Sequence, residues 1–112
     1  MRRIKTLKLN YEFKNVLTKG EFVGGKQVLV YAWDNKKGEN RLGIAISKKL
    51  AKAVKRNRIK RVIRAAYQEI NKESKQGKDI VFIWNKNEKI ENLDFNIVSS
   101  DIKKAFLKLG LI

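Results

Sequence analysis

The sequence contains no cysteine and no histidine. Their absence excludes disulfides, thiolate and imidazole metal sites, Ser-His or Cys-His catalysis and a histidine general base. Proline is also absent, and there are no repeats or low-complexity tracts, so we expect residues 1–112 to form a single domain. No apolar run approaches the length of a membrane span, and the basic N-terminus lacks the apolar stretch of a signal peptide. A cytoplasmic location is therefore expected.

Acidic residues are scarce: 11 Asp and Glu stand against 27 Lys and Arg, which gives a formal net charge of +16. None lies between Asn40 and Glu69, and half of the side chains from Ser47 to Arg64 are cationic. We call residues 47–64 the basic run. A merely solvated surface usually mixes signs, so this run predicts a partner with a regular array of negative charge, such as a phosphate backbone. Its candidate contact residues are Lys48, Lys49, Lys52, Lys55, Arg56, Asn57, Arg58, Lys60, Arg61 and Arg64.

The acids that are present do not suggest a catalytic metal site. Two-metal nuclease sites need carboxylates that converge within a few ångströms. Here the acids are spread over regions expected to be loops and helix caps, namely Asp34, Glu39, Asp79, Asp94 and Asp101. We therefore expect no metal ligand and no catalytic residue in this chain.

Apolar periodicity predicts a helix followed by three strands in the first half of the chain. Apolar residues recur at helical spacing between positions 9 and 17, which predicts a helix over residues 11–19 with Asn10 as its N-cap. A brief strand over residues 21–23 and a Gly24–Gly25 turn lead into an apolar strand over residues 27–33. After a polar loop, residues 41–47 resume a strand pattern. We expect these last two strands to pair antiparallel.

The second half predicts helix, strand, helix. A long helix begins near residues 51–53, or at an Asn57 cap, and ends before Gly77. Its apolar stripe is Ile59, Val62, Ile63, Ala66 and Ile70, and the basic residues lie mostly off that stripe. Residues 79–84 predict a buried strand that pairs parallel with a strand preceding the helix. A mostly polar segment over residues 85–98 then leads to a last helix, capped by Ser99 or Ser100.

Aromatic side chains are expected chiefly in the core, because they dominate interior area. Tyr31 is the exception: it shares a strand face with Leu29 and Trp33, and its hydroxyl favours a rim position where the ring could stack on an unpaired base. Phe13 could face the same groove. For Phe13 and Trp84, core and groove positions both remain open.

The segment from Arg41 to Arg64 closely resembles the signature of the protein component of bacterial ribonuclease P. It contains Arg-x-Gly at 41–43, Ser-Lys-Lys at 47–49, Ala-Val at 53–54, Arg-Asn-Arg at 56–58 and further basic residues at 60, 61 and 64. The resemblance extends outward to Leu7, Phe13 and Gly20, to the strand ending at residues 31–34 and to residues 79–83. It covers nearly the whole chain in order.

The resemblance implies an α+β two-layer domain in helix–strand–strand–strand–helix–strand–helix order, of the ribosomal protein S5 domain 2-like fold. Its β-α-β crossover would be left-handed, which general handedness rules do not predict. It also implies a ribonucleoprotein in which an RNA subunit with bound magnesium removes the 5′ leader from precursor tRNA. The protein subunit would be non-catalytic, with neither DNA nor a membrane as a partner.

The same resemblance assigns roles to the candidate residues. The basic run would contact the catalytic RNA, and Phe13, Leu17 and Tyr31 would line a groove for the single-stranded leader. Leu17 stands where the family usually has a second aromatic. The acid-containing segment over residues 85–98 is atypical, and we expect it to point away from RNA. On charge alone, a ribosomal or other structural RNA-binding protein without an associated enzyme is the alternative.

Overall fold

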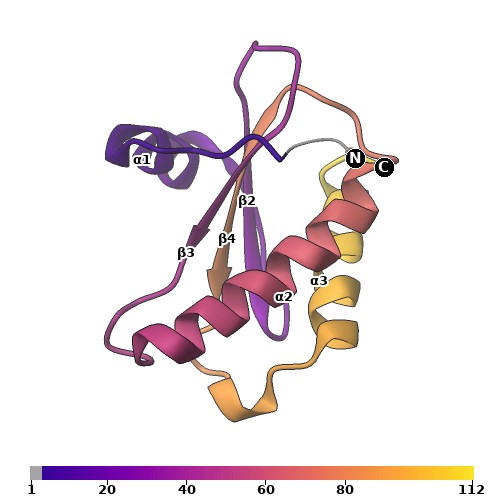
Figure 1. Cartoon of the computed structure of the whole chain (residues 1–112). Coiled ribbons are helices and arrows are strands. Elements are labelled where there is room, and N and C mark those ends of the chain that lie inside the picture. Colours follow the sequence, from indigo (N-terminus) through magenta and orange to yellow (C-terminus); the bar gives the residue numbers. More distant parts are fainter. Residues whose placement is uncertain (1–3) are drawn as a thin grey trace.

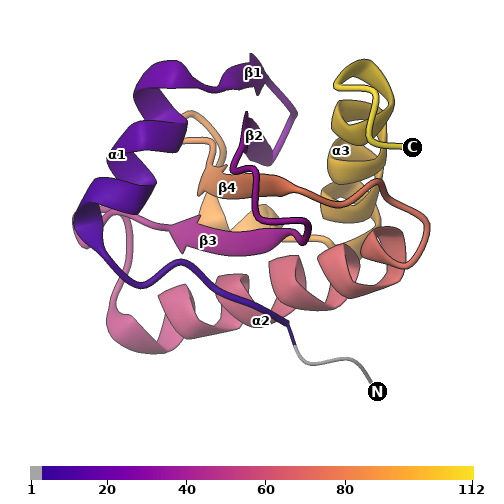
Figure 2. The ribbon, with the colours of Figure 1, turned by 90° about the horizontal axis from the view of Figure 1, so that it is seen from above.

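A four-stranded mixed sheet separates one helix from two others in the computed structural model, which describes residues 4–112 (Figures 1 and 2). Helix α1 covers one face of the sheet, and α2 and α3 cover the other. The elements, in chain order, are α1 (Asn10–Lys19), β1 (Glu21–Val23), β2 (Val28–Asp34), β3 (Arg41–Ala45), α2 (Ala53–Asn71), β4 (Lys78–Trp84), the 3₁₀ helix η1 (Ile90–Asn92) and α3 (Phe95–Lys108). This confirms the predicted α+β domain and element order, and adds η1.

Strand β4 occupies an inner position, because the strand order is β1-β2-β4-β3. The predicted antiparallel pairing of residues 27–33 with residues 41–47 is therefore wrong: β2 pairs antiparallel with β4, and β3 pairs parallel with β4. The physical reason is that β4 is apolar towards both layers, with Ile80, Val81 and Phe82 all fully buried. The predicted parallel pairing across the long helix is confirmed. Both views show that the β3–α2–β4 crossover is left-handed.

The larger core lies between the sheet and helices α2 and α3. The rings of Tyr67, Phe82 and Phe106 pack there with centroids 5.8 to 6.5 Å apart. The predicted apolar stripe of α2 faces this core, with Ile59, Ile63 and Ala66 buried and Val62 and Ile70 packed at its margin.

Trp84 belongs to the same core. It is only 1% exposed, and its indole Nε1 donates a hydrogen bond to the backbone oxygen of Glu88 at 3.0 Å. The core position, rather than a groove, is therefore correct for Trp84. Among residues 4–112, no helix combines the length and the apolar character needed to cross a membrane.

Helix α1 starts one residue earlier than predicted, at Asn10, and Asn10 is not its cap. Instead the Glu12 carboxylate accepts hydrogen bonds from the backbone N–H groups of Lys8 and Leu9, both at 2.9 Å. This arrangement satisfies donors that the helix itself leaves free.

Helices α2 and α3 also differ in detail from the prediction. Helix α2 begins at Ala53, so the alternative start at Asn57 is excluded, and it ends at Asn71, well before Gly77. Helix α3 begins at Phe95, because the Asp94 carboxylate accepts hydrogen bonds from the first-turn N–H groups of residues 96 and 97 at 2.7 and 3.3 Å. The predicted cap at Ser99 or Ser100 is therefore wrong, since both residues lie inside the helix.

Candidate nucleic-acid interface

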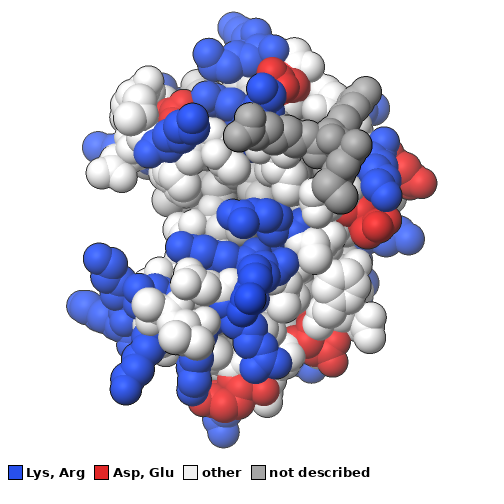
Figure 3. Space-filling view, viewed as in Figure 1, with Lys and Arg blue, Asp and Glu red and all other residues white. Residues whose placement is uncertain are grey.

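The basic run occupies the outer face of α2 and the turn before it, and Lys and Arg side chains gather over this region in Figure 3. The turn carries Lys48 and Lys49 and is closed by a hydrogen bond from the Leu50 N–H to the Ser47 oxygen at 3.1 Å. The apolar stripe of α2 is buried against the sheet, so the Lys and Arg residues on the rest of the helix surface face outward, as predicted. Exposed members are Lys48, Lys49, Lys52, Lys55, Asn57, Arg58, Arg61 and Arg64, whereas Arg56 and Lys60 are half-buried.

The N-terminus of α2 combines uncapped N–H groups with positive side chains. Lys52 precedes the helix without a side-chain cap, and no acidic residue lies in the first turn. Cations at this end oppose the helix dipole, whereas an anion there is favourable. Arg56 is partly engaged within the protein, because its Nη1 donates to the Ala51 oxygen at 2.7 Å. The helix start therefore has an excess of positive charge that an external phosphate would compensate.

The segment after β4 lies beside this helix start. Residues 86–91 line one hollow together with Leu50, Ala51, Lys52 and Lys55. The Lys55 Nζ lies 3.9 Å from the Glu91 Oε1, but both side chains are well exposed, so this pair contributes little stability. The expectation that residues 85–98 point away from RNA stays a prediction.

A second hollow joins the basic helix to α1 at the β3 edge of the sheet. Lys60 and Arg64 line it opposite Phe13, with the remaining lining residues Thr6, Leu7, Leu42, Gly43 and Ile44. Phe13 is half-buried, and its ring lies directly on Gly43, where an added Cβ would stand 2.6 Å from the Phe13 Cε2 atom. Glycine at this position thus allows the ring to reach the sheet. Phe13 therefore occupies both positions that the sequence leaves open: its ring packs in the small core, and it also forms part of the wall of this hollow.

On the α1 face, sheet register places Gly43, Val81, Tyr31 and Phe22 in one row across the four strands. Tyr31 is half-buried in the small core that also contains Phe13, and its ring stacks on Phe22 with centroids 4.9 Å apart. This agrees with the rim position predicted for Tyr31.

The next row on that face, Ala45, Ile83 and Leu29, is half-buried. Ile83 packs against the small core that includes Val16 of α1. Leu17 on α1 is 37% exposed. We call Ala45, Ile83, Leu29, Tyr31 and Phe22 the apolar strip. Phe22 was not among the residues singled out from the sequence, and a tight Gly24–Gly25 turn would have placed it opposite Gln27; the longer connection between β1 and β2 places it opposite Tyr31.

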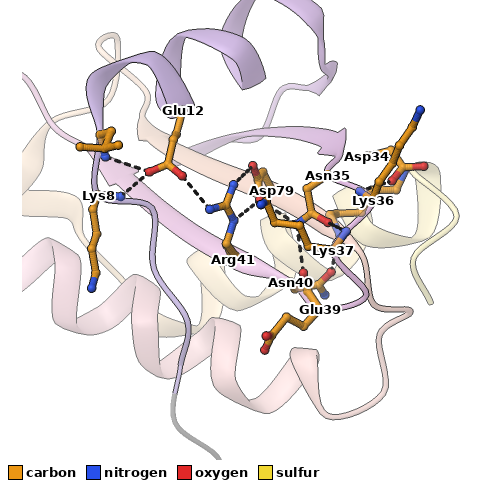
Figure 4. A network of polar contacts seen from close by, with 12 residues as sticks. Lys8, Glu12, Asp34, Asn35, Lys36, Lys37, Glu39, Asn40, Arg41 and Asp79 are labelled. Atoms are coloured by element: carbon orange, nitrogen blue, oxygen red, sulfur yellow. Dashed lines mark hydrogen bonds and ion pairs between the residues drawn. The ribbon is translucent and has the colours of Figure 1, made fainter.

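An ionic network fixes α1 to the sheet beside the second hollow (Figure 4). Arg41 on β3 contacts Asp79 on β4 through Nε–Oδ1 and Nη2–Oδ2 distances of 2.7 and 2.6 Å, and its Nη1 lies 2.6 Å from the Glu12 Oε2 on α1. Asp79 is 1% exposed and also accepts a hydrogen bond from the Asn35 amide at 2.8 Å. Backbone N–H bonds from Leu9 and Lys8, aided by Arg41, hold the pKa of Glu12 below its usual range.

The same network determines the chemical role of its charged groups. Hydrogen bonds with Asp79, and then Glu12, raise the pKa of Arg41, so this guanidinium stays charged. Within residues 4–112 there is no cluster of three acidic side chains that could hold a metal ion. The network therefore holds α1 in place against the sheet.

Comparison with known proteins identifies the family. The Ribonuclease P family model matches residues 1–110. The ribonuclease P protein component of Thermoanaerobacter sp. (strain X514) is 36% identical over 110 residues, covering 98% of this chain and 93% of that protein. That of Clostridioides difficile (strain 630) is 42% identical over 82 residues, covering 72% of each chain. Among solved structures, Staphylococcus aureus RNase P protein gives a TM-score of 0.78 at 31% identity, with 96% of both chains covered. The protein from Thermotoga maritima gives a TM-score of 0.81 at 27% identity, covering 93% of this chain and 96% of that one. The chain belongs to the ribonuclease P protein family.

Proposed function

We propose that this chain is the protein subunit of a ribonuclease P ribonucleoprotein that removes the 5′ leader from precursor tRNA. The observation that carries the proposal is the meeting of two surfaces: the outward cations of α2 and the hollow that Lys60 and Arg64 share with Phe13. A polyanion on the helix and a single strand beside α1 can be held at the same time.

The basic run is suited to a folded RNA subunit. Arg58, Arg61 and Arg64 are exposed on α2, and Arg forks can bind phosphate oxygens in pairs. Lys48, Lys49 and Lys52 extend the same charge around the helix start, where uncapped N–H groups favour an anion. Such contacts lower the repulsion between two RNAs and depend little on base sequence.

The α1 side is suited to an unpaired strand. Phe13 and Leu17 lie on α1, and Tyr31 lies on the face of the sheet that α1 covers, where its half-buried ring keeps part of its surface open. Base stacking on such rings tolerates any sequence, because every base has a π-face. The protein would then respond to the presence of a leader and favour precursor over mature tRNA.

Hydrolysis is assigned to the RNA subunit with its magnesium ions. This chain has no histidine or cysteine, and its buried carboxylates already serve the fold. Asp79 is bound by Arg41, and Asp101 accepts hydrogen bonds from the backbone N–H groups of residues 26, 27 and 28 at 3.1, 2.7 and 3.0 Å. A carboxylate engaged in this way is not free to activate water.

Reconstitution tests the proposal directly. Purified protein is assayed for precursor-tRNA cleavage alone and with a bacterial ribonuclease P RNA, over a range of magnesium and salt. We expect no cleavage by the protein alone, and cleavage at lower magnesium and salt when the protein joins the RNA. Cleavage by stringently purified protein without RNA would contradict the assignment of catalysis. No effect on the RNA would favour a structural RNA-binding protein without an enzyme.

A further inference from the structure

Phe22 is a large apolar side chain that the fold leaves open to solvent. It lies on the edge strand β1, opposite Tyr31 on β2, and remains 53% exposed. The next residue, Val23, packs against the core on the other face of the sheet, which fixes Phe22 on the face of α1. Its ring stacks on Tyr31 with centroids 4.9 Å apart and an interplanar angle of 39°.

An exposed phenylalanine on a three-residue edge strand has no structural necessity. Edge strands usually carry charged or small side chains, because an apolar edge invites aggregation. Gly24 also leaves the neighbouring apolar side chains uncovered, because a Cβ there would lie 3.5 Å from the Phe22 Cζ and 4.0 Å from the Leu29 Cδ2. Phe22 therefore ends an uninterrupted apolar surface instead of filling a gap in the core.

The apolar strip has a direction that fits an extended strand of RNA. It begins at Ala45, shortly before the turn that carries Lys48 and Lys49, and it crosses all four strands to Phe22. With strands about 4.8 Å apart, this crossing spans roughly 14 Å. Charge for the phosphates thus lies at one end of the strip, and the paired aromatic rings lie at the other.

We propose that Phe22 and Tyr31 together form a distal stacking platform for an unpaired base of the 5′ leader. The inference rests on the proposed function and adds a specificity residue to its leader groove. Leu17 offers only an aliphatic side chain on α1, so Phe22 supplies a second flat ring from the sheet instead. Phe13 shares its hollow with Lys60 and Arg64, where the catalytic RNA would bind, so we place the cleavage site nearer to Phe13 and the platform, at the opposite edge of the sheet, farther along the leader.

The test uses the reconstituted holoenzyme and precursor tRNAs whose leaders increase one nucleotide at a time. Affinities for each precursor and for mature tRNA are measured with wild type and with Phe22→Ala. We expect the variant to lose roughly 5- to 160-fold in affinity for long leaders, the range expected for one base stack. The shortest leaders and mature tRNA should bind as to wild type. Phe95→Ala, which removes a 45% exposed ring at the start of α3, is the matched control and should change nothing.

Two further variants decide between explanations. Phe22→Leu keeps apolar volume but removes the ring, so it should reproduce the loss; wild-type affinity with Phe22→Leu would overturn the inference. Tyr31→Ala separates the inference from the proposed function. If Tyr31→Ala weakens precursor binding and Phe22→Ala does not, the platform is wrong and the groove stands. If neither weakens it, the leader groove fails as well. A change only in self-association, measured by sedimentation, would make Phe22 a protein contact and overturn the inference.

Discussion

Replacing Arg58 and Arg61 together by Ala should weaken binding to ribonuclease P RNA and flatten its salt dependence. Both side chains are exposed on the outer face of α2, and within residues 4–112 neither has an ion pair or a side-chain hydrogen bond to the protein. Their loss should therefore change the free energy of unfolding by less than about 1 kcal/mol, or about 0.5 kcal/mol for each substitution. Arg56 is a poorer choice, because it donates to the Ala51 oxygen and so also supports the start of the helix.

The size of the effect follows from counterion release. Each lost phosphate contact lowers the slope of log affinity against log salt by roughly 0.7 to 0.9, so the double variant should lose about 1.4 to 1.8. Over a fourfold rise in salt, wild-type affinity should then fall about 7- to 12-fold more than that of the variant.

A control variant of equal charge makes this result specific. Lys103→Ala with Lys104→Ala removes two exposed cations from α3, on a different helix, and lowers the net charge by the same amount. RNA affinity is measured for all three proteins over a salt series, and folding is checked by circular dichroism and thermal unfolding. If both double variants flatten the slope equally, total charge rather than the α2 surface drives binding, and the reasoning is refuted.

Three further predictions concern the support of this surface. Gly43→Ala should destabilise the protein by about 1–3 kcal/mol in chemical denaturation, because the new Cβ would displace the Phe13 ring; an unchanged midpoint would contradict the contact. The folded-state pKa of Glu12 is lowered, so its stabilisation is complete above about pH 4.5 and is lost as pH falls through the folded pKa. Unfolding experiments should accordingly show a steeper acid loss in wild type than in Glu12→Gln, and parallel curves would refute it. Glu91→Gln should tighten RNA binding slightly, severalfold at most, by freeing Lys55; weaker binding in a low-salt titration would rule this out.

Local patterns in the sequence were sufficient to predict the elements and the outward basic face. The apolar stripe of α2 specified which side chains face the sheet, so the Lys and Arg residues off that stripe could only face outward. Tyr31 alternates with buried neighbours on β2, so its rim position was also predictable. These features depend on spacing along one element.

Strand order depended on information that local spacing does not contain. The two strands joined by the loop over residues 35–40 suggested a hairpin, but β4 competes for both of them through its two apolar faces. The Arg41 network was equally inaccessible, since its partners Glu12 and Asp79 lie far apart in the sequence. The start of α3 could have been predicted locally, because the buried Val98 lies four residues before Ile102 and extends the same apolar face, which moves the cap back to Asp94.

The inner position of β4 also determines the order in which the molecule can assemble. Strands β2 and β3 both form their long ladders with β4, residues 78–84. Until that segment is available, β1 and β2 form an isolated hairpin, and such a hairpin is only marginally stable in water. Synthesis delivers the polycationic helix α2 before β4. The basic helix is thus made before the strand β4 against which it packs, and closure of the non-local β3–β4 ladder is the step that gives the basic surface its shape.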